Sequence, residues 1–228
     1  MTDPAPGRLT VVATPIGNLD DLSPRLRRAL EEADLVACED TRRTGRLLAH
    51  LGLKKRLVSL HEHNERQRLP GLIAALEQGS RVALASDAGT PLISDPGYLL
   101  VREAIAAGLP VEAVPGPSAP LTALVLSGLP PYPHTFVGFP PRKPGKRRAF
   151  LARYAELDHT LILFESPHRI AATLDDLLAT LGDRPAALCR ELTKLHEEVI
   201  RGTLTEIRAA VGERERVKGE LTLVVGPG

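Results

Sequence analysis

Apolar residues gather in short runs along the whole chain, and segments of helical spacing lie between most of these runs. In the first half the runs show little alternation of apolar and polar positions, which is typical of strands covered on both faces. The strands predicted there span residues 9–14, 34–38, 56–60, 81–86 and 111–115. This repeated strand-helix order predicts an α/β fold with a mostly parallel sheet and helices on both faces.

The helices between these strands have recognisable start and stop signals. Ser23 is placed to cap a helix whose first position is Pro24, and a second helix is predicted from Thr41 to His50. A third helical segment, residues 65–79, contains Pro70. Proline inside a helix removes a backbone hydrogen bond, so we expect a break near that residue.

A Pro/Gly cluster at residues 115–120 interrupts the pattern, and a second cluster, which includes the basic segment 142–148, follows a short helix at 121–128. After it the sequence predicts the strands 160–165, 186–192 and 220–226, the helix 168–181, a turn at 197–202 and a capped helix from 203. We place a domain boundary near residue 116. It separates an N-terminal α/β domain (1–116) from a C-terminal α/β domain (117–228).

Composition narrows the possible functions. The 29 basic and 28 acidic residues leave a net charge of +1, so any contact with a polyanion must come from a local patch. Aromatic residues make up only 3% of the chain, which argues against RNA-binding modules built on rows of stacking rings. Cys38 and Cys189 lie in apolar runs, as buried thiols of a reducing compartment do, and no metal-ligand spacing is present. No apolar run approaches the ~18 residues of a membrane span, so we expect a cytoplasmic protein.

The segment "SDAGTPLISDPG", residues 86–97, is long for a loop between a strand and a helix. A helix start capped by Asp95 before Pro96 would explain its second half but not "SDAGTPL". Loops at this edge of an open α/β sheet are also where ligands bind. The residues alone leave both interpretations open.

Two other segments carry candidate chemistry at strand ends. "TPIGNLDDLS" (14–23) follows the first strand and is either a tight turn or a ligand loop. In "CEDTRRTGR", Glu39 and Asp40 end the second strand and could act as acid or base, or could only complement a helix dipole. The next helix brings arginines that could hold phosphate or be solvated: Arg42, Arg43 and Arg46.

The strongest local concentration of positive charge is "RKPGKRR". Pro141, Pro144 and Gly145 predict an extended, mobile start for this segment. Phosphate contacts are its natural use, and a solvated surface loop is the alternative. The cations concerned are Arg142, Lys143, Lys146, Arg147 and Arg148.

The segments "VVATPIGNLDDLSPR", "CEDTRRTGRLLAH", "SLHEHNE", "SDAGTPLISDPG", "PGPSA", "SGLP", "FESPHR" and "RELTKLHEE" occur in this order across nearly the full chain. Together they resemble the ribosomal RNA small subunit methyltransferase I group of the tetrapyrrole methylase-like superfamily. The resemblance implies a two-lobed α/β fold with a mixed-sheet C-terminal domain, S-adenosyl-L-methionine as cofactor in the cleft between the lobes, and a homodimer. It also implies 2′-O-methylation of a cytidine ribose in the decoding region of bacterial 16S rRNA, within the small ribosomal subunit.

The resemblance also assigns roles to individual residues. The superfamily's glycine-rich loop falls on "ATPIG", where Ile16 stands in place of a proline and Gly17 matches. Its acidic residue at the end of the second strand falls on Glu39 or Asp40, and we hypothesise that this carboxylate helps to remove the proton of the ribose hydroxyl. The expected cofactor contacts are Ile16, Gly17, Ser86, Asp87, Ala88, Gly89, Thr90, Ile93, Ser118, Ala119, Glu165 and Leu192.

Two other functions remain open at this point. A methylase of the same fold could act on a corrinoid or porphyrin precursor, although a tetrapyrrole pocket would not need the cationic segment 142–148. A non-catalytic nucleotide- or RNA-binding module would turn over no S-adenosylmethionine. Methyl transfer to ribosomal RNA separates the three possibilities.

Overall fold

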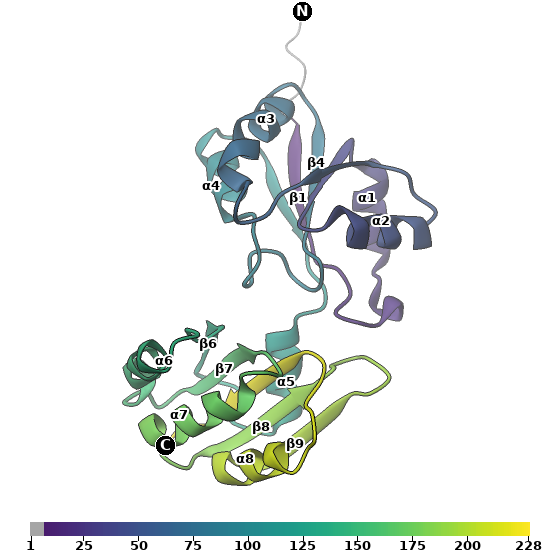
Figure 1. Cartoon of the computed structure of the whole chain (residues 1–228). Coiled ribbons are helices and arrows are strands. Elements are labelled where there is room, and N and C mark those ends of the chain that lie inside the picture. The colour runs from purple at the N-terminus through teal and green to yellow at the C-terminus, as the bar shows by residue number, and fades with distance from the viewer. Residues whose placement is uncertain (1–6) are drawn as a thin grey trace, which may run out of the picture. The chain divides into compact units, whose positions relative to one another are not determined.

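The computed structural model describes residues 7–228, and these divide into two compact units, one ending at Ser118 and the other beginning at Ala119. Each unit is built around its own five-stranded sheet. Figure 1 shows the helices that pack on these sheets. The expected fold class, a parallel sheet followed by a mixed sheet, is confirmed.

The first unit is a three-layer α/β/α structure with the strand order β3-β2-β4-β1-β5, and every neighbouring pair in it is parallel. Its strands are β1 (Arg8–Val12), β2 (Leu35–Cys38), β3 (Arg56–Ser59), β4 (Arg81–Ala85) and β5 (Val111–Val114). Its helices are α1 (Pro24–Glu32), α2 (Thr41–His50), α3 (Glu65–Glu77) and α4 (Tyr98–Ala106), with a 3-10 turn at Leu19–Asp21. All five predicted strands are present, with bounds that differ from the predicted ones by at most two residues.

Alternate residues of each central strand of this sheet face opposite helical layers. Leu35 and Ala37 of β2 pack with the residues of α3 and α4, whereas Val36 and Cys38 pack with those of α1 and α2. Because both sets are apolar, the strand shows no alternation in the sequence. Ser23 caps α1 through its side chain, as expected.

Pro70 does not break α3, so that expectation was wrong. The helix runs from Glu65 to Glu77 with Pro70 inside it. Leu72 and Leu76, which lie beyond the proline, are buried in the core. Their packing outweighs the one backbone hydrogen bond that a proline cannot donate.

The second unit has the strand order β6-β7-β10-β8-β9, in which only β6 and β7 are parallel. Its strands are β6 (His134–Gly138), β7 (Thr160–Glu165), β8 (Pro185–Arg190), β9 (Glu198–Thr203) and β10 (Leu221–Val225). Its helices are α5 (Ala119–Ser127), α6 (Pro144–Leu151), α7 (Ile170–Leu181) and α8 (Leu204–Gly212), with a 3-10 turn at Ala152–Tyr154. Side chains of α6, α7 and α8 form one core with one face of this sheet.

Two expectations for this unit were wrong. Residues 197–202 are not a turn, because Glu198–Thr203 form the edge strand β9, paired antiparallel with β8. This strand is only partly buried and therefore has no apolar run to reveal it. The alternative of a loop over the whole basic segment was also wrong: its start is extended only as far as Lys143, because Pro144 occupies the first turn of α6, a position where proline favours a helix.

The two cysteines, Cys38 and Cys189, are buried free thiols, as predicted. Within residues 7–228, no helix is both long enough and apolar enough to span a bilayer.

Candidate functional site

The two loops predicted to bind a ligand, those after β1 and β4, are bonded to each other at the carboxyl edge of the first sheet. The loop after β1 and the loop after β4 form an isolated antiparallel bridge between Thr14 and Gly89. The Thr14 amide donates to the Gly89 carbonyl over 2.9 Å, and the Gly89 amide donates to the Thr14 carbonyl over 3.0 Å. Residues 14–17 and 86–93 therefore form one continuous structure.

Two features of this bridge favour glycine at position 89. Its φ of +78° lies in the left-handed region, and a Cβ there would meet the Cγ2 atom of Ile16 at 3.1 Å. The next residue, Thr90, donates its hydroxyl to the Pro117 carbonyl over 3.1 Å, which ties the loop to the chain that precedes Ser118. The structure thus brings Ile16, Gly89 and Thr90 together.

The remaining residues of the loop after β4 differ in exposure. Ser86 is buried, and its hydroxyl lies 3.3 Å from the Gly89 carbonyl oxygen. Asp87 and Ala88 are half-buried, whereas Ile93 is exposed between Leu92 and Ser94, both of which have positive φ. Two non-glycine residues in this conformation are uncommon, and such backbone strain clusters at functional sites.

The far end of this loop is fixed by α3 and not by Asp95. The Oε1 atom of buried Glu65 accepts from the amides of Gly97 and Leu99 over 3.1 and 3.0 Å, which caps the start of α4. An Asp95 cap was therefore the wrong expectation. The Asp95 side chain is instead half-buried beside the hydroxyl of Ser86.

Burial raises the pKa of Asp95 to about 7, and the charges of Glu39 and Asp87 act in the same direction. Asp95 was not among the residues predicted to carry chemistry. The only sequence feature that pointed to Asp95 was a second Ser-Asp pair in the loop, and a helix cap was a sufficient explanation for that pair.

The structure separates the two carboxylates between which the sequence could not choose. Asp40 caps α2, accepting from the Arg42 amide over 2.8 Å, and its carboxylate also lies 2.6 Å from the Nη2 atom of Arg42. These contacts hold the pKa of Asp40 well below its usual range. For Glu39, burial and the nearby charge of Asp87 raise the pKa instead. At neutral pH, Glu39 is therefore the better proton acceptor of the two.

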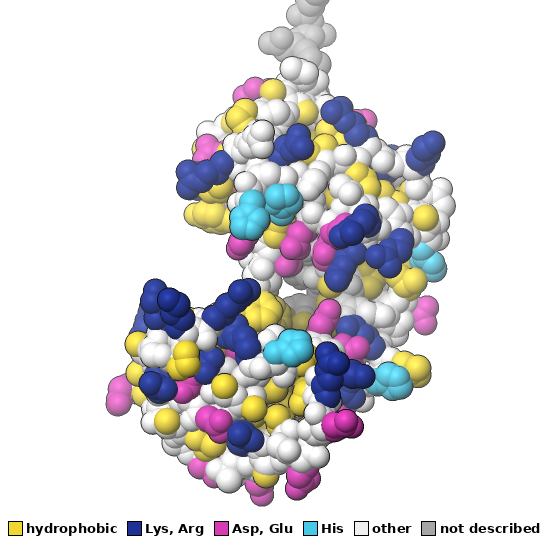
Figure 2. Space-filling view, viewed as in Figure 1, with side chains coloured by type: hydrophobic (Ala, Val, Ile, Leu, Met, Phe, Trp, Pro, Cys, Tyr) yellow, Lys and Arg dark blue, Asp and Glu magenta, His cyan; other side chains and the backbone are white. Residues whose placement is uncertain are grey.

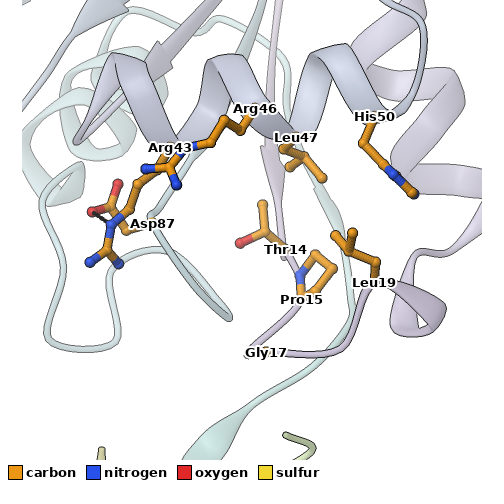
Figure 3. A pocket seen from close by; sticks show the side chains of 9 residues that line it. All are labelled: Thr14, Pro15, Gly17, Leu19, Arg43, Arg46, Leu47, His50 and Asp87. Atoms are coloured by element: carbon orange, nitrogen blue, oxygen red, sulfur yellow. Dashed lines mark ion pairs between the residues drawn. The ribbon is translucent and has the colours of Figure 1, made fainter. Parts of the chain in front are cut away.

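A pocket of about 400 Å³ lies between α2 and the loop after β1 (Figure 3). Asp87 stands at one end, where it contacts Arg43 at 3.4 Å and accepts from the Asp40 amide over 3.0 Å. Arg42 is exposed and does not line the pocket. The lining residues are Thr14, Pro15, Gly17, Leu19, Arg43, Arg46, Leu47, His50 and Asp87.

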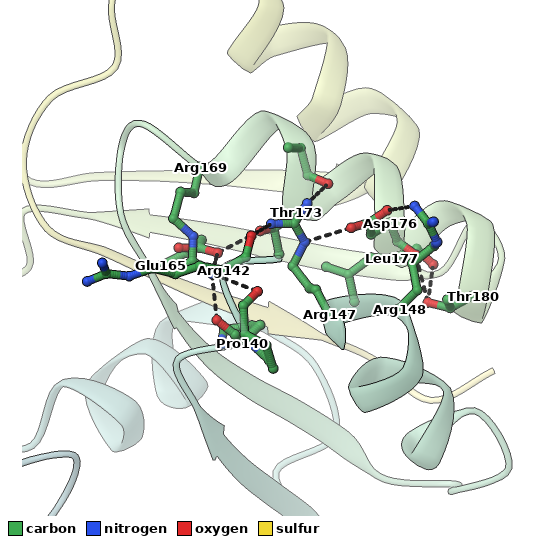
Figure 4. A network of polar contacts seen from close by, with 12 residues as sticks. Pro140, Arg142, Arg147, Arg148, Glu165, Arg169, Thr173, Asp176, Leu177 and Thr180 are labelled. Atoms are coloured by element: carbon green, nitrogen blue, oxygen red, sulfur yellow. Dashed lines mark hydrogen bonds and ion pairs between the residues drawn. The ribbon is translucent and has the colours of Figure 1, made fainter. Parts of the chain in front are cut away.

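The predicted site residues of the second unit include one side chain whose carboxylate is already fully engaged. Glu165 is buried at the end of β7, and its carboxylate contacts Arg169 at 2.9 Å and the Thr173 hydroxyl at 2.6 Å and accepts from the Ser166 amide at 2.7 Å (Figure 4). The Glu165 side chain is therefore neither exposed nor free to bind a ligand. Ala119 begins α5, and Leu192 is buried in the loop after β8.

Arg147 was wrongly expected to be a surface cation. Its guanidinium is buried and pairs with Asp176 of α7 at 2.6 Å, which fixes α6 on α7 (Figure 4). Arg148 also reaches Asp176, at 3.2 Å, but remains exposed. Lys143 and Lys146 are exposed as well, and Arg142 belongs to the same segment. Figure 2 shows Lys and Arg side chains gathered on this part of the second unit.

Comparison with known proteins places the chain in a family. The sequence profile described as Tetrapyrrole (Corrin/Porphyrin) Methylases matches residues 8–208. Two solved structures of similar fold are the uroporphyrin-III-C-methyltransferase of Thermus thermophilus (TM-score 0.67, 25% identity, 96% of this chain and 94% of that one) and the methyltransferase CobJ (TM-score 0.73, 20% identity, 97% and 95%).

Curated relatives are more similar in sequence. Proteins named ribosomal RNA small subunit methyltransferase I share 52% identity over 222 residues in Mycobacterium bovis and 50% over 222 residues in Xylella fastidiosa. These matches cover 96% of this chain and 77% and 81% of the relatives. The chain therefore belongs to the tetrapyrrole methylases and, within them, to the ribosomal RNA small subunit methyltransferase I group.

Proposed function

We propose that this protein transfers a methyl group from S-adenosylmethionine to the ribose 2′ oxygen of a cytidine in the decoding region of 16S rRNA. The observation that carries the proposal is the similarity of about 50% over 96% of the chain to proteins named for small-subunit rRNA methylation. The name of these relatives supports methylation of small-subunit rRNA, and the 2′ oxygen, the cytidine and the decoding region are our own inference.

The bridged loops at residues 14–17 and 86–93 suit a cofactor that has both polar and apolar groups. Gly89 has no side chain, so a ligand can approach its backbone closely. Thr90 holds the loop in place through its hydrogen bond to Pro117, and the exposed Ile93 offers an apolar contact. When bound, S-adenosylmethionine supplies a methyl group on a positively charged sulfur. Contacts from Ser118, Ala119, the backbone at Glu165 and Leu192 remain predictions.

Glu39 is our choice for the proton acceptor. A 2′-hydroxyl is a weak nucleophile at neutral pH, and a positioned base that takes its proton raises the rate. Asp40 is already engaged by Arg42, so its basicity is low. Burial and the charge of nearby Asp87 raise the pKa of Glu39, so its carboxylate holds a proton more readily than that of Asp40.

The substrate's phosphates would be held by cations of both units, namely Arg42, Arg43, Arg46, Arg142, Lys143, Lys146 and Arg148. Each contact replaces condensed counterions, so the affinity should fall as salt is added. Arg147 is left out because its side chain is buried.

The direct test supplies the purified protein with S-adenosylmethionine carrying a labelled methyl group and with small ribosomal subunits from a strain lacking this methylation. We expect label in 16S rRNA, recovered after alkaline hydrolysis as a resistant dinucleotide that contains 2′-O-methylcytidine. Label on a base, label only on a tetrapyrrole precursor, or no label at all would each contradict the proposal.

A further inference from the structure

One face of α2 forms a wall of the pocket described above. Arg43, Arg46, Leu47 and His50 follow the i, i+3, i+4, i+7 spacing that places side chains on one side of a helix. The facing wall comes from the loop after β1, where Pro15 and Leu19 approach Leu47 across the pocket (Figure 3). The Leu19 side chain is 46% exposed although it is large and apolar.

The side chains at the two ends of the pocket differ in chemistry. Arg43 and Asp87 stand at one end, while Leu19 and His50 stand at the other (Figure 3). Arg43 has a carboxylate partner in Asp87, whereas Arg46 has none among the described residues and bonds only to the carbonyl of Arg42 in its own helix, at 3.5 Å. Arg46 is therefore free to bind an anion.

The apolar side chains and the Arg46 guanidinium of this pocket match the groups of a nucleotide. A nucleotide has a flat base with apolar faces, a ribose, and a negatively charged phosphate. A volume of about 400 Å³ falls within the usual range for small-ligand pockets. Thr14, Gly17 and Asp87 line the pocket and also belong to the loops to which we assign the cofactor, so a ribose bound here lies next to those loops.

We propose that this pocket receives the acceptor nucleotide of the RNA, turned out of its stack, with its base between Pro15, Leu19 and Leu47 and a neighbouring phosphate on Arg46. The inference rests on the proposed function and adds to it the place of the substrate. Sequence-specific RNA recognition commonly uses unstacked bases, and enzymes that modify nucleotides extrude them into pockets. The few aromatic residues of the chain agree with a base held by aliphatic side chains.

The first experiment measures kinetics with small ribosomal subunits. Leu19→Ala and Arg46→Ala should each lower kcat/KM for the subunit by about tenfold or more, because each removes contact with the acceptor nucleotide. The dissociation constant of S-adenosylmethionine, measured by calorimetry, should change by less than about twofold, since neither residue is assigned to the cofactor. The matched controls are Ile105→Ala on α4 and Arg28→Ala on α1, which remove an exposed apolar side chain and an exposed cation elsewhere in the same unit.

The second experiment uses the fact that both native cysteines are buried. Leu19→Cys therefore creates an accessible thiol at the pocket, which can carry a photoreactive benzophenone group. We expect crosslinks to rRNA at the acceptor nucleotide or its immediate neighbours, mapped by stops in reverse transcription. Ile105→Cys, labelled in the same way, should not crosslink there.

The outcomes separate this inference from the proposed function. If the unmodified protein fails to methylate rRNA, the proposed function fails. If it methylates rRNA but the pocket variants match their controls, or the crosslinks map away from the methylated nucleotide, the pocket assignment is wrong. An equal loss of cofactor affinity in Leu19→Ala would show that the pocket holds the cofactor, which would also overturn the inference.

Discussion

Carboxylates at the edge of the first sheet differ in what surrounds each of them. Asp40 has a guanidinium and backbone amides around it, whereas Glu39 and Asp95 are partly buried among other carboxylates. Three acids close together in space therefore have different proton affinities at neutral pH. Such divergence between neighbouring groups is typical of acid-base sites.

Glu39→Gln should lower kcat for rRNA methylation by about 100-fold, because it removes the carboxylate that we propose as proton acceptor. Asp40→Asn should change kcat by less than about threefold, since asparagine can still cap α2 and Asp40 is not assigned to the chemistry. In the wild type, kcat/KM should rise with pH as Glu39 ionises, because burial raises the pKa of this proposed base above its usual value. A larger loss in Asp40→Asn than in Glu39→Gln would show that the assignment is reversed.

Asp95 should also affect stability. Its pKa in the folded protein is about 7 and its unfolded pKa is about 3.9, so between these values the folded state binds more protons and the free energy of unfolding falls as pH rises. Asp95→Asn stays neutral and should be more stable than the wild type at pH 8, by ~1–2 kcal/mol, a figure reduced for partial exposure to solvent. Near pH 4 the advantage should disappear.

The measurement is urea unfolding of both proteins across this pH range. Asp158→Asn, which neutralises a carboxylate in the second unit, is the control. An advantage for Asp95→Asn that is the same at pH 4 and pH 8 would mean that ionisation of Asp95 is not its cause.

At the scale of elements, Glu65 joins α3 to the start of α4 by accepting two backbone amides. Glu65→Ala leaves both amides without that acceptor in a buried position, so we expect it to lower the free energy of unfolding by about 2–4 kcal/mol. Glu65→Gln keeps an amide oxygen as acceptor and should cost about half as much. Equilibrium unfolding in urea measures both.

Glu77→Ala, which removes an exposed carboxylate at the end of the same helix, is the control for this pair and should have little effect. If Glu65→Ala were no less stable than Glu77→Ala, the cap would contribute nothing to the stability of α4.

The helices and strands also show which parts of the fold can be predicted from local sequence patterns. The buried strands of the first unit, the α1 cap and the Thr203–Glu206 capping box were predictable because each depends on residues near one another in the chain. The unbroken course of α3 and the β9 edge strand were not, since packing of Leu72 and pairing with β8 decide them, and the burial of Arg147 depends on its long-range ion pair with Asp176. The same holds for the site: loop 86–97 was visible in the sequence, whereas the Glu65 cap and the pKa of Asp95 depend on long-range contacts.

For the molecule as a whole, the net charge of +1 means that attraction to RNA must come from local groups of cations. Replacing Lys143 and Lys146 with Ala should weaken binding of small-subunit rRNA and reduce the slope of log K against log salt by about 1–2, because one or two fewer phosphates are neutralised. The change should be similar for different RNA sequences, because phosphate contacts carry no sequence information. Filter binding over a range of salt concentrations measures the slope.

Arg216→Ala with Lys218→Ala is the matched control, because it removes two exposed cations from another part of the second unit. Equal slopes for the two double variants would mean that the exposed cations of α6 and the residues before it do not contact phosphate.

The loop between β4 and α4 is attached near its start by the Thr14–Gly89 bridge and at its end by Glu65. A segment attached at both ends has little conformational freedom left to lose when a ligand binds. If the cofactor binds here as proposed, it meets a loop that is already ordered, because the strain at Leu92 and Ser94 is borne during folding. We therefore expect the backbone of this loop to change little in conformation when a ligand binds to it.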